Sequence, residues 1–448
     1  MKLSEKKIEE EKKKSLTYSI KEGGAASVME GAGNSYISPF AIALNASNSQ
    51  VGMLASIPSI LSPLAQLITA KFVRKIKSRR DLIGLFVLIQ ALLWIPIILL
   101  PFIIKTNQVT YLIILFGILT MSGSFIGPIW ASLISDLVNA EDRGKYFGKR
   151  NSITGSVAIA FTFIVAFILD AFTSKLFIAF SVVFLFALLG RLLSYYYLRK
   201  HYDPEITVSQ EQYFTFTQFL KRVPFTNFGK FTVYFSLINF GTFIAAPFFT
   251  VYMLRTLEFT YSQYTIVLMT AAIASLIGMR VWGKLGDEFG NVRILKLLGV
   301  AVSIAPMLWI FSNNIYYLIL VQIFAGFTWG GFTLCASNFI YDNVKREKRA
   351  LVISYYNVVN GIMIFFGASL GGYLLSNLDL KFMKTIFFIF LLSGFVRFIA
   401  HVIFSNKLHE KRDVKHLNHA FELINVMPMQ GLVHEVVGVL YRRKRKKK

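Results

Sequence analysis

The sequence predicts an all-α polytopic membrane protein with twelve transmembrane helices. Between about residues 23 and 404 the chain is a series of apolar stretches separated by short loops, and 55% of all residues are hydrophobic. Each stretch is long enough to cross a bilayer, because about 20 apolar residues in a helix span about 30 Å of hydrocarbon. Backbone polar groups in lipid must be satisfied within their own segment, which favours helices over strands. The stretches are centred near residues 33, 62, 93, 124, 160, 187, 241, 273, 303, 329, 362 and 393.

The distribution of charge predicts the orientation of these helices. The net charge of +24 would suggest nucleic-acid binding in a soluble protein. Here, however, the cations lie almost entirely at the ends of the apolar stretches. If the N-terminus is cytoplasmic and successive loops alternate between the two sides of the membrane, the loops on the opposite side contain only five Lys and Arg residues. These are Lys105, Lys175, Arg255, Lys381 and Lys384. The positive-inside rule therefore predicts a protein of the cytoplasmic membrane with both termini in the cytoplasm, anionic lipids as partners and no nucleic acid.

Hydrophilic segments divide the chain into five parts. The first 22 residues are highly charged and indicate a cytoplasmic tail, and the longest interior hydrophilic stretch separates six helices from six. After the last helix, residues 417–441 are partly apolar and residues 442–448 are seven consecutive cations. This end is either a membrane-surface segment with a polybasic anchor or a disordered tail. The predicted parts are a tail (1–22), a six-helix bundle (23–200), a linker (201–226), a second six-helix bundle (227–405) and a basic tail (406–448).

An internal repeat relates the two halves. A shift of 206 residues superposes the end of the fourth stretch on the end of the tenth, with seven identities in 22 positions. The same shift, without having been chosen for it, places Arg191 in the sixth stretch on Arg397 in the twelfth. Duplicated halves are common in transporters. The identical pairs are Ile134/Ile340, Asp136/Asp342, Val138/Val344, Glu141/Glu347, Arg143/Arg349, Asn151/Asn357 and Gly155/Gly361.

The loop after the eighth stretch carries the most specific local pattern, GKLGDEFGNVR, with Gly283, Asp287, Gly290 and Arg293. It resembles the signature loop of the major facilitator superfamily, which follows helices 2 and 8. The loop after the fourth stretch, DLVNAEDRGKYFG with Arg143, is similar to that superfamily as well. The resemblance covers the whole spanning region. It implies two pseudo-symmetric six-helix bundles around a central cavity that opens alternately to each side, and a monomer is expected.

The resemblance also implies a gate at the cytoplasmic helix ends. In this family the motif aspartate, here Asp287, and basic residues tie these ends together in the outward-open state. Helix dipoles and cations stabilise such a carboxylate, and glycines let helices approach closely. A loop required only for folding and topology is the alternative.

Charged residues at the ends of the fourth and tenth stretches belong to the same region. Asp136 lies near Arg143, and Asp342 lies near Arg349. We expect ion pairs between these residues in the gate region.

The first half departs from the family pattern. Alignment of Lys71 with Lys284 puts Arg74 in the place of the aspartate, and Ala70 and Lys77 replace two glycines. Helix 4 has no buried arginine and helix 5 has no Gly-Pro-Gly-Gly-like run, so two signatures of proton-coupled drug antiporters are missing.

Glu30 is the clearest candidate for function, because ionisable residues deep in a span are costly. It lies near the middle of the first stretch, on one helical stripe with Ser27, Asn34, Ser38 and Asn45. Two interpretations remain open. Glu30 either carries a proton or acts as counter-ion for a cationic substrate, or it is a permanently protonated residue hydrogen-bonded to Asn34 or another helix.

Other polar and charged residues in the spans are weaker candidates. Arg191 and Arg397 lie in the cytoplasmic half of their helices, and we expect them to reach the interface and share a structural task, with substrate contact as the alternative. The resemblance implies that helices 1, 4, 7 and 10 line the cavity, and the seventh and tenth stretches offer Asn239, Gln322 and Trp329. Trp329 could stack on a substrate or serve packing.

The sequence leaves three functions open. The first is a secondary active transporter that exports hydrophobic or cationic compounds, with protons as candidate coupling ion. The second is an importer of a neutral metabolite such as a sugar or nucleoside. The third is a non-transporting sensor or a lipid scramblase. No catalytic site, cofactor or metal site is expected. A phosphate-binding loop is not expected either, because the nearest match to its pattern ends in Leu285, where Ser or Thr would hold magnesium.

Overall fold

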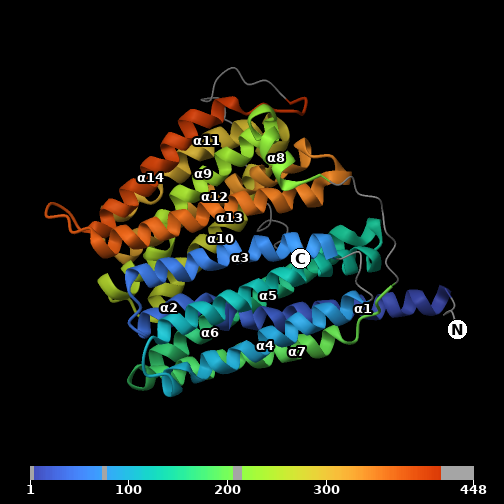
Figure 1. The fold of residues 1–448 in the computed structure, drawn as a ribbon, viewed down its shortest axis with the longest axis horizontal. Helices are drawn as coiled ribbons and strands as arrows, with labels where there is room; N and C mark the ends of the chain where they lie inside the picture. The colour runs from blue at the N-terminus through green and yellow to red at the C-terminus, as the bar shows by residue number, and fades with distance from the viewer. Residues whose placement is uncertain (1–4, 73–77, 205–213, 415–448) are drawn as a thin grey trace, which may run out of the picture.

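The computed structural model describes residues 5–72, 78–204 and 214–414, and within them every regular element is a helix (Figure 1). Eleven helical segments are long and apolar enough to cross a membrane, and an interrupted helix at the start of the chain supplies the twelfth crossing. The predicted fold class is therefore confirmed. The crossings after the first are α3 (Asn48–Phe72), α4 (Arg79–Ile103), α5 (Gln108–Leu137), α6 (Arg143–Ala171), α7 (Leu176–Leu198), α9 (Asn227–Val251, continued by the π-helix η7, Tyr252–Thr256), α10 (Tyr261–Phe289), α11 (Asn291–Ile304, followed by η8, Met307–Ile310), α12 (Ile315–Asn343), α13 (Arg346–Asn377) and α14 (Thr385–Phe404).

The first crossing is built from four consecutive pieces. The helix α1 (Glu5–Val28) runs into a π-helix, η1 (Met29–Gly33), then a 3-10 turn, η2 (Asn34–Tyr36), and a last helix, α2 (Ile37–Ala43). The segment expected as a charged tail is thus helical from residue 5 onward. Its final turn packs into the first bundle, where Glu22 is only 5% exposed. The expected Arg74 site and the basic end of the chain lie outside the described residues.

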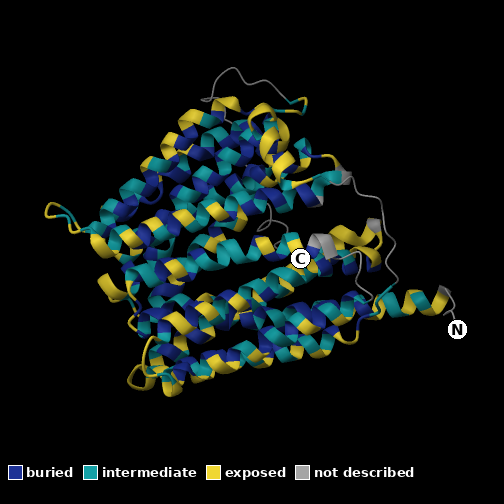
Figure 2. Cartoon of the chain, viewed as in Figure 1, coloured by how far each residue is buried: buried dark blue, intermediate teal, exposed yellow. Residues whose placement is uncertain are grey.

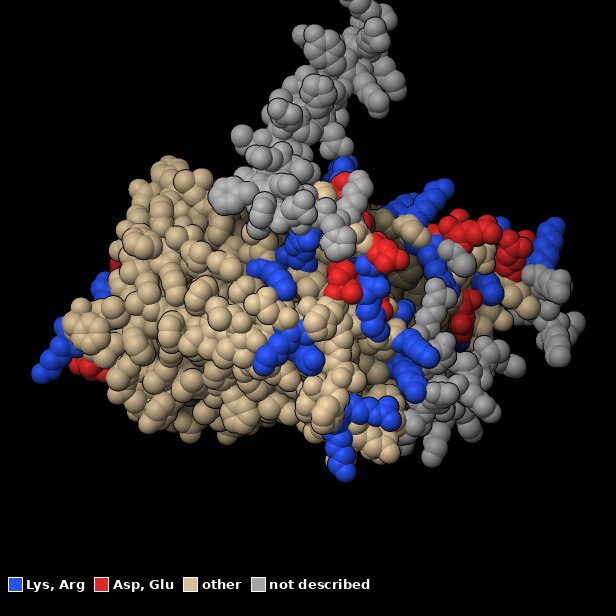
Figure 3. All heavy atoms as spheres, turned by 90° about the horizontal axis from the view of Figure 1, so that it is seen from above, with Lys and Arg blue, Asp and Glu red and all other residues tan. Residues whose placement is uncertain are grey.

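Six crossings in each half place residues 5, 204, 214 and 414, which bound the described segments, on one side of the molecule. We call this side the terminal side and the other the opposite side. The first bundle contains α1 to α7 and the second α9 to α14, and the short helix α8 (Phe216–Arg222) precedes the second bundle. Charged side chains gather toward the terminal side, whereas most of the molecular surface is uncharged (Figure 3). Many residues on the outer faces of the helices are exposed although they are apolar, as expected for surfaces that face lipid (Figure 2).

Three hydrophobic cores show where the two bundles meet. The largest is continuous across both bundles and includes Phe40 of α2 and Phe248 of α9 on the opposite side. In the terminal half each bundle has its own core, around Leu133 in the first and Phe231 in the second. The bundles therefore share one core on the opposite side and have separate buried cores on the terminal side, where Leu67 of α3 packs against the core of the second bundle.

Hydrogen bonds between the bundles follow the same distribution. On the opposite side the Tyr36 hydroxyl lies 2.7 Å from Thr265 Oγ1, and the hydroxyl groups of Ser49 and Ser376 lie 2.9 Å apart. The carboxylate of Asp170 on α6 accepts bonds from the backbone N–H groups that begin α10. These contacts close the opposite side of the molecule.

The bundles are connected by the helix pair α3–α13 and by the helix pair α6–α10, and these two pairs are not equivalent. Helix α3 lies against α13 so closely that a Cβ on Gly361 would come within 2.1 Å of the Ser59 carbonyl oxygen. Gly155 of α6 occupies the position equivalent to Gly361 in the internal repeat, and nothing lies within 4 Å of a Cβ built there. The α3–α13 pair therefore stays closed at mid-membrane, whereas the terminal half of α6 faces open space.

We expect Gly361→Val to separate α3 from α13 and weaken the contact on the opposite side. The measurement is disulfide formation between cysteines introduced at Ser49 and Ser376, whose hydroxyl groups are in contact. The native Cys335 is fully buried and does not compete. Cross-linking should fall at least severalfold in Gly361→Val.

The matched control is Gly155→Val, the same substitution at the repeat-equivalent position. It should leave the cross-linking yield unchanged, because the new side chain enters open space. Equal yields in both variants would contradict the proposed role of Gly361.

Candidate functional site

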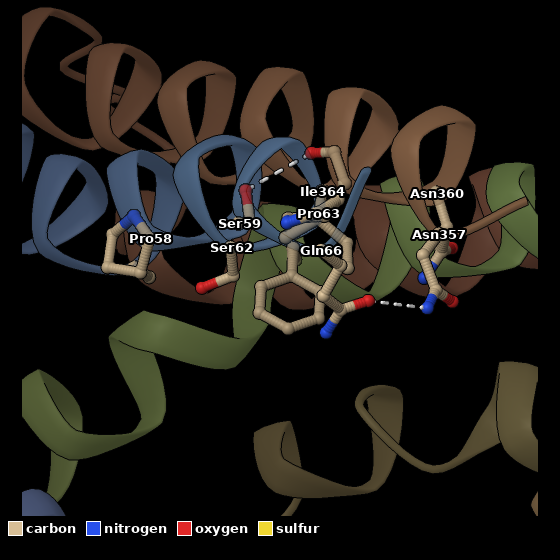
Figure 4. Close-up of a pocket in the computed structure, with 11 residues that line it drawn as sticks. Pro58, Ser59, Ser62, Pro63, Gln66, Asn357, Asn360 and Ile364 are labelled. Carbon is tan, nitrogen blue, oxygen red and sulfur yellow. Dashed lines mark hydrogen bonds between the residues drawn. The ribbon is translucent and has the colours of Figure 1, made fainter. Parts of the chain in front are cut away.

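A cavity of about 360 Å³ lies between the bundles at the level of the α3–α13 contact (Figure 4). This volume is within the usual range of small-ligand pockets, about 300–1,000 Å³. We call it the inter-bundle cavity. It is lined by α3, α9 and α13 through Ala55, Pro58, Ser59, Ser62, Pro63, Gln66, Phe243, Asn357, Asn360, Gly361 and Ile364.

The polar groups of the inter-bundle cavity are neutral amides and hydroxyls. Asn357 donates a 3.0 Å hydrogen bond to Gln66, and the Ser59 hydroxyl donates to the backbone carbonyl of Gly361 at 3.1 Å. Both bonds connect α3 to α13 (Figure 4). Asn360 accepts a bond of 2.8 Å from Asn239. Such groups can form hydrogen bonds with the polar groups of a solute and do not require the solute to carry a charge.

The sequence did not single out most of these residues, and of the helices expected to line a cavity only helix 7, here α9, lines this one. Helices 2 and 11, here α3 and α13, line the inter-bundle cavity, whereas helices 1, 4 and 10 do not. Asn239 reaches its edge through Asn360. Gln322 and Trp329 instead line a second cavity inside the second bundle, and Glu30 and Asn34 line neither. Pro58 and Pro63, both within α3, were the available signal, since prolines mark irregular spans.

Glu30 lies in the π-helical turn η1 that interrupts the first crossing. Its side chain is exposed, while Met29 and Gly31 to Gly33 on either side are buried against the first bundle. Asn34 donates a 2.9 Å hydrogen bond to its carboxylate, as one interpretation of the sequence expected. Glu30 therefore lies on the helix face that the first bundle leaves uncovered. Single π-turns inside α-helices occur frequently at functional sites.

A chain of buried polar groups crosses the first bundle beside this turn. Arg191 donates to Gln90 and, at 3.3 Å, to Ser194, whose hydroxyl donates to Glu22 at 3.1 Å. Glu22 also forms an ion pair of 3.3 Å with Arg150. The prediction that Arg191 reaches the interface was wrong, since the side chain is 6% exposed and is compensated inside the bundle.

Arg397 occupies the equivalent position in the second bundle and is likewise buried, at 3% exposure. The prediction that it reaches the interface was therefore also wrong. It donates to the backbone carbonyl of Val302 and to the Ser393 hydroxyl, both at 2.8 Å. Its guanidinium lies 5.9 Å from the ring centre of Trp329.

On the terminal side of the first bundle, Arg79 holds three helix ends together. This residue begins α4 and is 1% exposed. It forms ion pairs with Asp136 at the end of α5 (2.6 Å) and with Asp203 after α7 (3.5 Å). Asp203 also accepts a bond from the backbone N–H of Arg80 in the first turn of α4. The expected pair between Asp136 and Arg143 is not formed, because Arg79 lies closer to Asp136 and Arg143 donates to the Ser135 carbonyl instead.

The second bundle builds the corresponding cluster from different residues. Arg412, beyond α14, bonds to Asp287 of the signature loop at 3.3 Å and to Asp342 at the end of α12 at 3.2 Å. Glu410 accepts a bond from the backbone N–H of Val292, which caps α11 as Asp203 caps α4. Arg349 donates to the carbonyl of Tyr341, so the expected pair with Asp342 is replaced by the contact with Arg412.

The glycines of the signature loop allow close contacts around this cluster. Gly290 has a positive φ of 95° at the junction of α10 and α11, and a Cβ there would come within 2.8 Å of the Glu410 carboxylate. A Cβ on Gly283 would come within 2.9 Å of Leu334 on α12. Arg293 lies in the first turn of α11, half-buried beside these residues. The signature loop is thus part of the terminal-side cluster of the second bundle.

Comparison with known proteins agrees with this architecture. The model of the Major Facilitator Superfamily matches residues 24–249 and again residues 231–434. The chain belongs to the Major Facilitator Superfamily. The first match covers the first bundle and extends into α9, and the second begins within α9 and continues through the second bundle.

Individual relatives are more distant. The chain is 23% identical over 119 residues to the multidrug export protein EmrB of Haemophilus influenzae, which is 27% of this chain and 23% of EmrB. It is 30% identical over 115 residues to the class H tetracycline resistance protein of Pasteurella multocida, or 25% of this chain and 28% of that protein. The matches thus span about a quarter of the length of these curated relatives.

Solved structures of superfamily members share the fold. A mutant of the nucleoside transporter NupG superposes with a TM-score of 0.71 at 12% identity, covering 88% of this chain and 100% of that chain. A bacterial homologue of the human lysosomal transporter Spinster, in an inward-facing and occupied conformation, gives a TM-score of 0.67 at 12% identity, covering 88% and 96%.

We expect Arg79→Ala to lower the unfolding free energy by about 3 kcal/mol, because it leaves Asp203 buried without its cation. The measurement is unfolding of the purified protein by SDS in mixed micelles. The neighbouring Arg80→Ala is the control, since that side chain is 32% exposed and its pair with Asp81 contributes about 0–1 kcal/mol. A loss in Arg79→Ala no larger than in Arg80→Ala would show that the cluster does not stabilise the bundle.

Proposed function

We propose that this superfamily member is a secondary active transporter that moves a small solute across the cytoplasmic membrane by alternating access. The asymmetric contact between the bundles carries this proposal. One core joins the bundles on the opposite side, separate cores fill their terminal halves, and a cavity lies between them. Rocking of two bundles around such a cavity exposes it to each side in turn.

We propose further that the terminal side is cytoplasmic. The excess of Lys and Arg on the loops of that side supports this orientation. With that orientation the structure is in an inward-facing state, and the inter-bundle cavity is loaded from or emptied into the cytoplasm.

For the substrate, we propose export of hydrophobic or cationic compounds in exchange for protons. The partial similarity to multidrug and tetracycline resistance proteins supports this direction and class. Glu30 supplies a carboxylate for a cation or a proton. In this state its side chain is exposed. When the bundles close over this face of the first crossing, water is removed from the carboxylate, and the loss of solvent favours the neutral acid, which couples proton binding to the conformational change.

The second candidate is import of a neutral metabolite, and the lining of the inter-bundle cavity favours it. Its described polar groups are the neutral side chains of Ser59, Ser62, Gln66, Asn357 and Asn360. The fold is shared with the nucleoside transporter NupG, whose name indicates a solute of this class, and this supports the second candidate. Deletion of an exporter would make cells drug-sensitive, whereas deletion of an importer would remove growth on a nutrient.

We expect Glu30→Gln to abolish flux driven by a pH gradient, because glutamine keeps the hydrogen-bonding shape of the carboxyl group but cannot release a proton. The measurement uses proteoliposomes with radiolabelled tetracycline in one series and uridine in another. Exchange without a pH gradient should remain, since the path and the cavity are intact.

Glu9→Gln is the matched control, because Glu9 lies in the first helix with its carboxylate in solvent and should leave pH-driven flux unchanged. Flux of tetracycline would support the exporter, and flux of uridine would support the importer. Normal pH-driven flux in Glu30→Gln would overturn the coupling role. Absence of flux for both substrates in the unsubstituted protein would count against both candidates.

A further inference from the structure

The second cavity lies entirely within the second bundle and has a volume of about 350 Å³. We call it the Arg397 cavity. Aromatic and small apolar side chains form most of its wall, and Arg397 and Gln322 are its most polar groups. The lining residues are Thr242, Ala246, Phe249, Ala271, Ala272, Ser275, Ala305, Pro306, Trp309, Gln322, Ala325, Gly326, Trp329 and Arg397.

The charge of Arg397 has no acidic partner among the described residues. Its hydrogen bonds go to a backbone carbonyl and a hydroxyl, both neutral, and its Nε has no partner. A buried cation without an anion costs several kcal/mol of desolvation that neutral acceptors offset only in part. The acidic residues of the second bundle all lie in loops or at helix ends, at Glu258, Asp287, Glu288, Asp342, Glu347 and Asp379.

The equivalent arginine in the first bundle shows how this fold compensates such a charge. Arg191 also leaves Nε without a partner, but its hydrogen bond to Ser194 connects it to the carboxylate of Glu22. Under the 206-residue shift, Phe228 of α9 occupies the position of Glu22, and α9 contains no acidic residue. The second bundle therefore has the arginine without an acid at the equivalent place.

The space beside Arg397 is suited to an apolar body that carries one negative charge. Trp329 lies under the guanidinium, and Trp309 and Phe249 are in ring contact at a centroid distance of 4.7 Å in the same wall. Aromatic walls favour a flat ring, and a guanidinium binds a carboxylate through two parallel N–H groups. The cavity volume is at the small end of the range for ligand pockets.

We propose that the Arg397 cavity is a binding site for a small aromatic carboxylate, with the carboxylate on Arg397 and the ring between the aromatic side chains. The site lies apart from the inter-bundle cavity and does not depend on the proposed substrate or direction of transport. Its ligand supplies the negative charge that the second bundle lacks.

The experiment is isothermal titration calorimetry of the purified full-length protein with 2-naphthoate at pH 7.5. The neutral 2-naphthamide and the cationic 2-naphthylmethylamine have the same ring system and serve as reference ligands. We expect naphthoate to bind at least tenfold more tightly than either, because only the carboxylate pairs with the guanidinium. Equal affinity for naphthoate and naphthamide, or no binding of naphthoate, would overturn the proposal.

Two variants test the location of the site independently. Arg397→Gln removes the cation and should weaken naphthoate binding at least tenfold, whereas Arg397→Lys keeps the charge and should weaken it less. Ala325→Phe fills the cavity without altering the arginine and should abolish binding. Leu320→Phe adds a phenyl ring on the same helix at a position that is 64% exposed, and should leave the affinity unchanged.

The thermal midpoint of each variant without ligand shows whether it is folded, and Ala325→Phe keeps the test valid if Arg397→Gln does not fold. Full affinity in both Arg397→Gln and Ala325→Phe would place naphthoate elsewhere and overturn the proposal. The naphthoate titration is then repeated with added phosphatidylglycerol, to distinguish a site for a small carboxylate from a site for an anionic lipid. Competitive loss of naphthoate binding would assign the site to a lipid head group instead.

Discussion

The close contact between α3 and α13 joins the two bundles of this protein beside the inter-bundle cavity. Gly361 allows α13 to approach the backbone of α3, and the hydrogen bonds of Ser59 and Gln66 then connect the two helices up to the terminal half. The inter-bundle cavity lies along this contact. On the other side of the molecule, α6 has no comparable contact at Gly155. The bundles are therefore in close backbone contact at Gly361, and the repeat-equivalent position in α6 has no such contact.

The two six-helix bundles have acidic residues at equivalent helix ends, but the cations that bind these acids come from different parts of the chain. The acids that end α5 and α12 are equivalent, yet the cation that binds them comes from α4 in one half and from beyond α14 in the other. Both halves also cap the third helix of the bundle with an acid from the segment after the sixth, Asp203 in one and Glu410 in the other. The geometry of the terminal side requires a cap and a cation at these places, and different parts of the chain supply them.

Much of the fold could be predicted from the sequence, because hydropathy and the positive-inside bias constrain helices in lipid strongly. The internal repeat and the loop around Asp287 indicated the family. The site was harder to predict for physical reasons. Gln66 and Asn360 are ordinary polar residues until α3 and α13 are placed side by side, and tertiary contacts alone do that. Local pairing rules failed for similar reasons, because Asp136 and Arg143 are close in sequence but the buried Arg79 from another helix takes the acid. The π-turn at Glu30 also shifts the helical register, which a stripe drawn with regular α-helical spacing does not represent.

The different burial of the two terminal-side clusters makes the halves unequal in their response to ions. Arg79 is enclosed, whereas Arg412 is 32% exposed and its partner Asp287 is 72% exposed. At physiological ionic strength the Debye length is about 8 Å, so salt weakens exposed pairs far more than enclosed ones. We therefore expect a rise in ionic strength to weaken the pair between Arg412 and Asp287 more than the pairs of Arg79. The two duplicated halves would then differ in how strongly the salt content of the surrounding water affects their terminal ends.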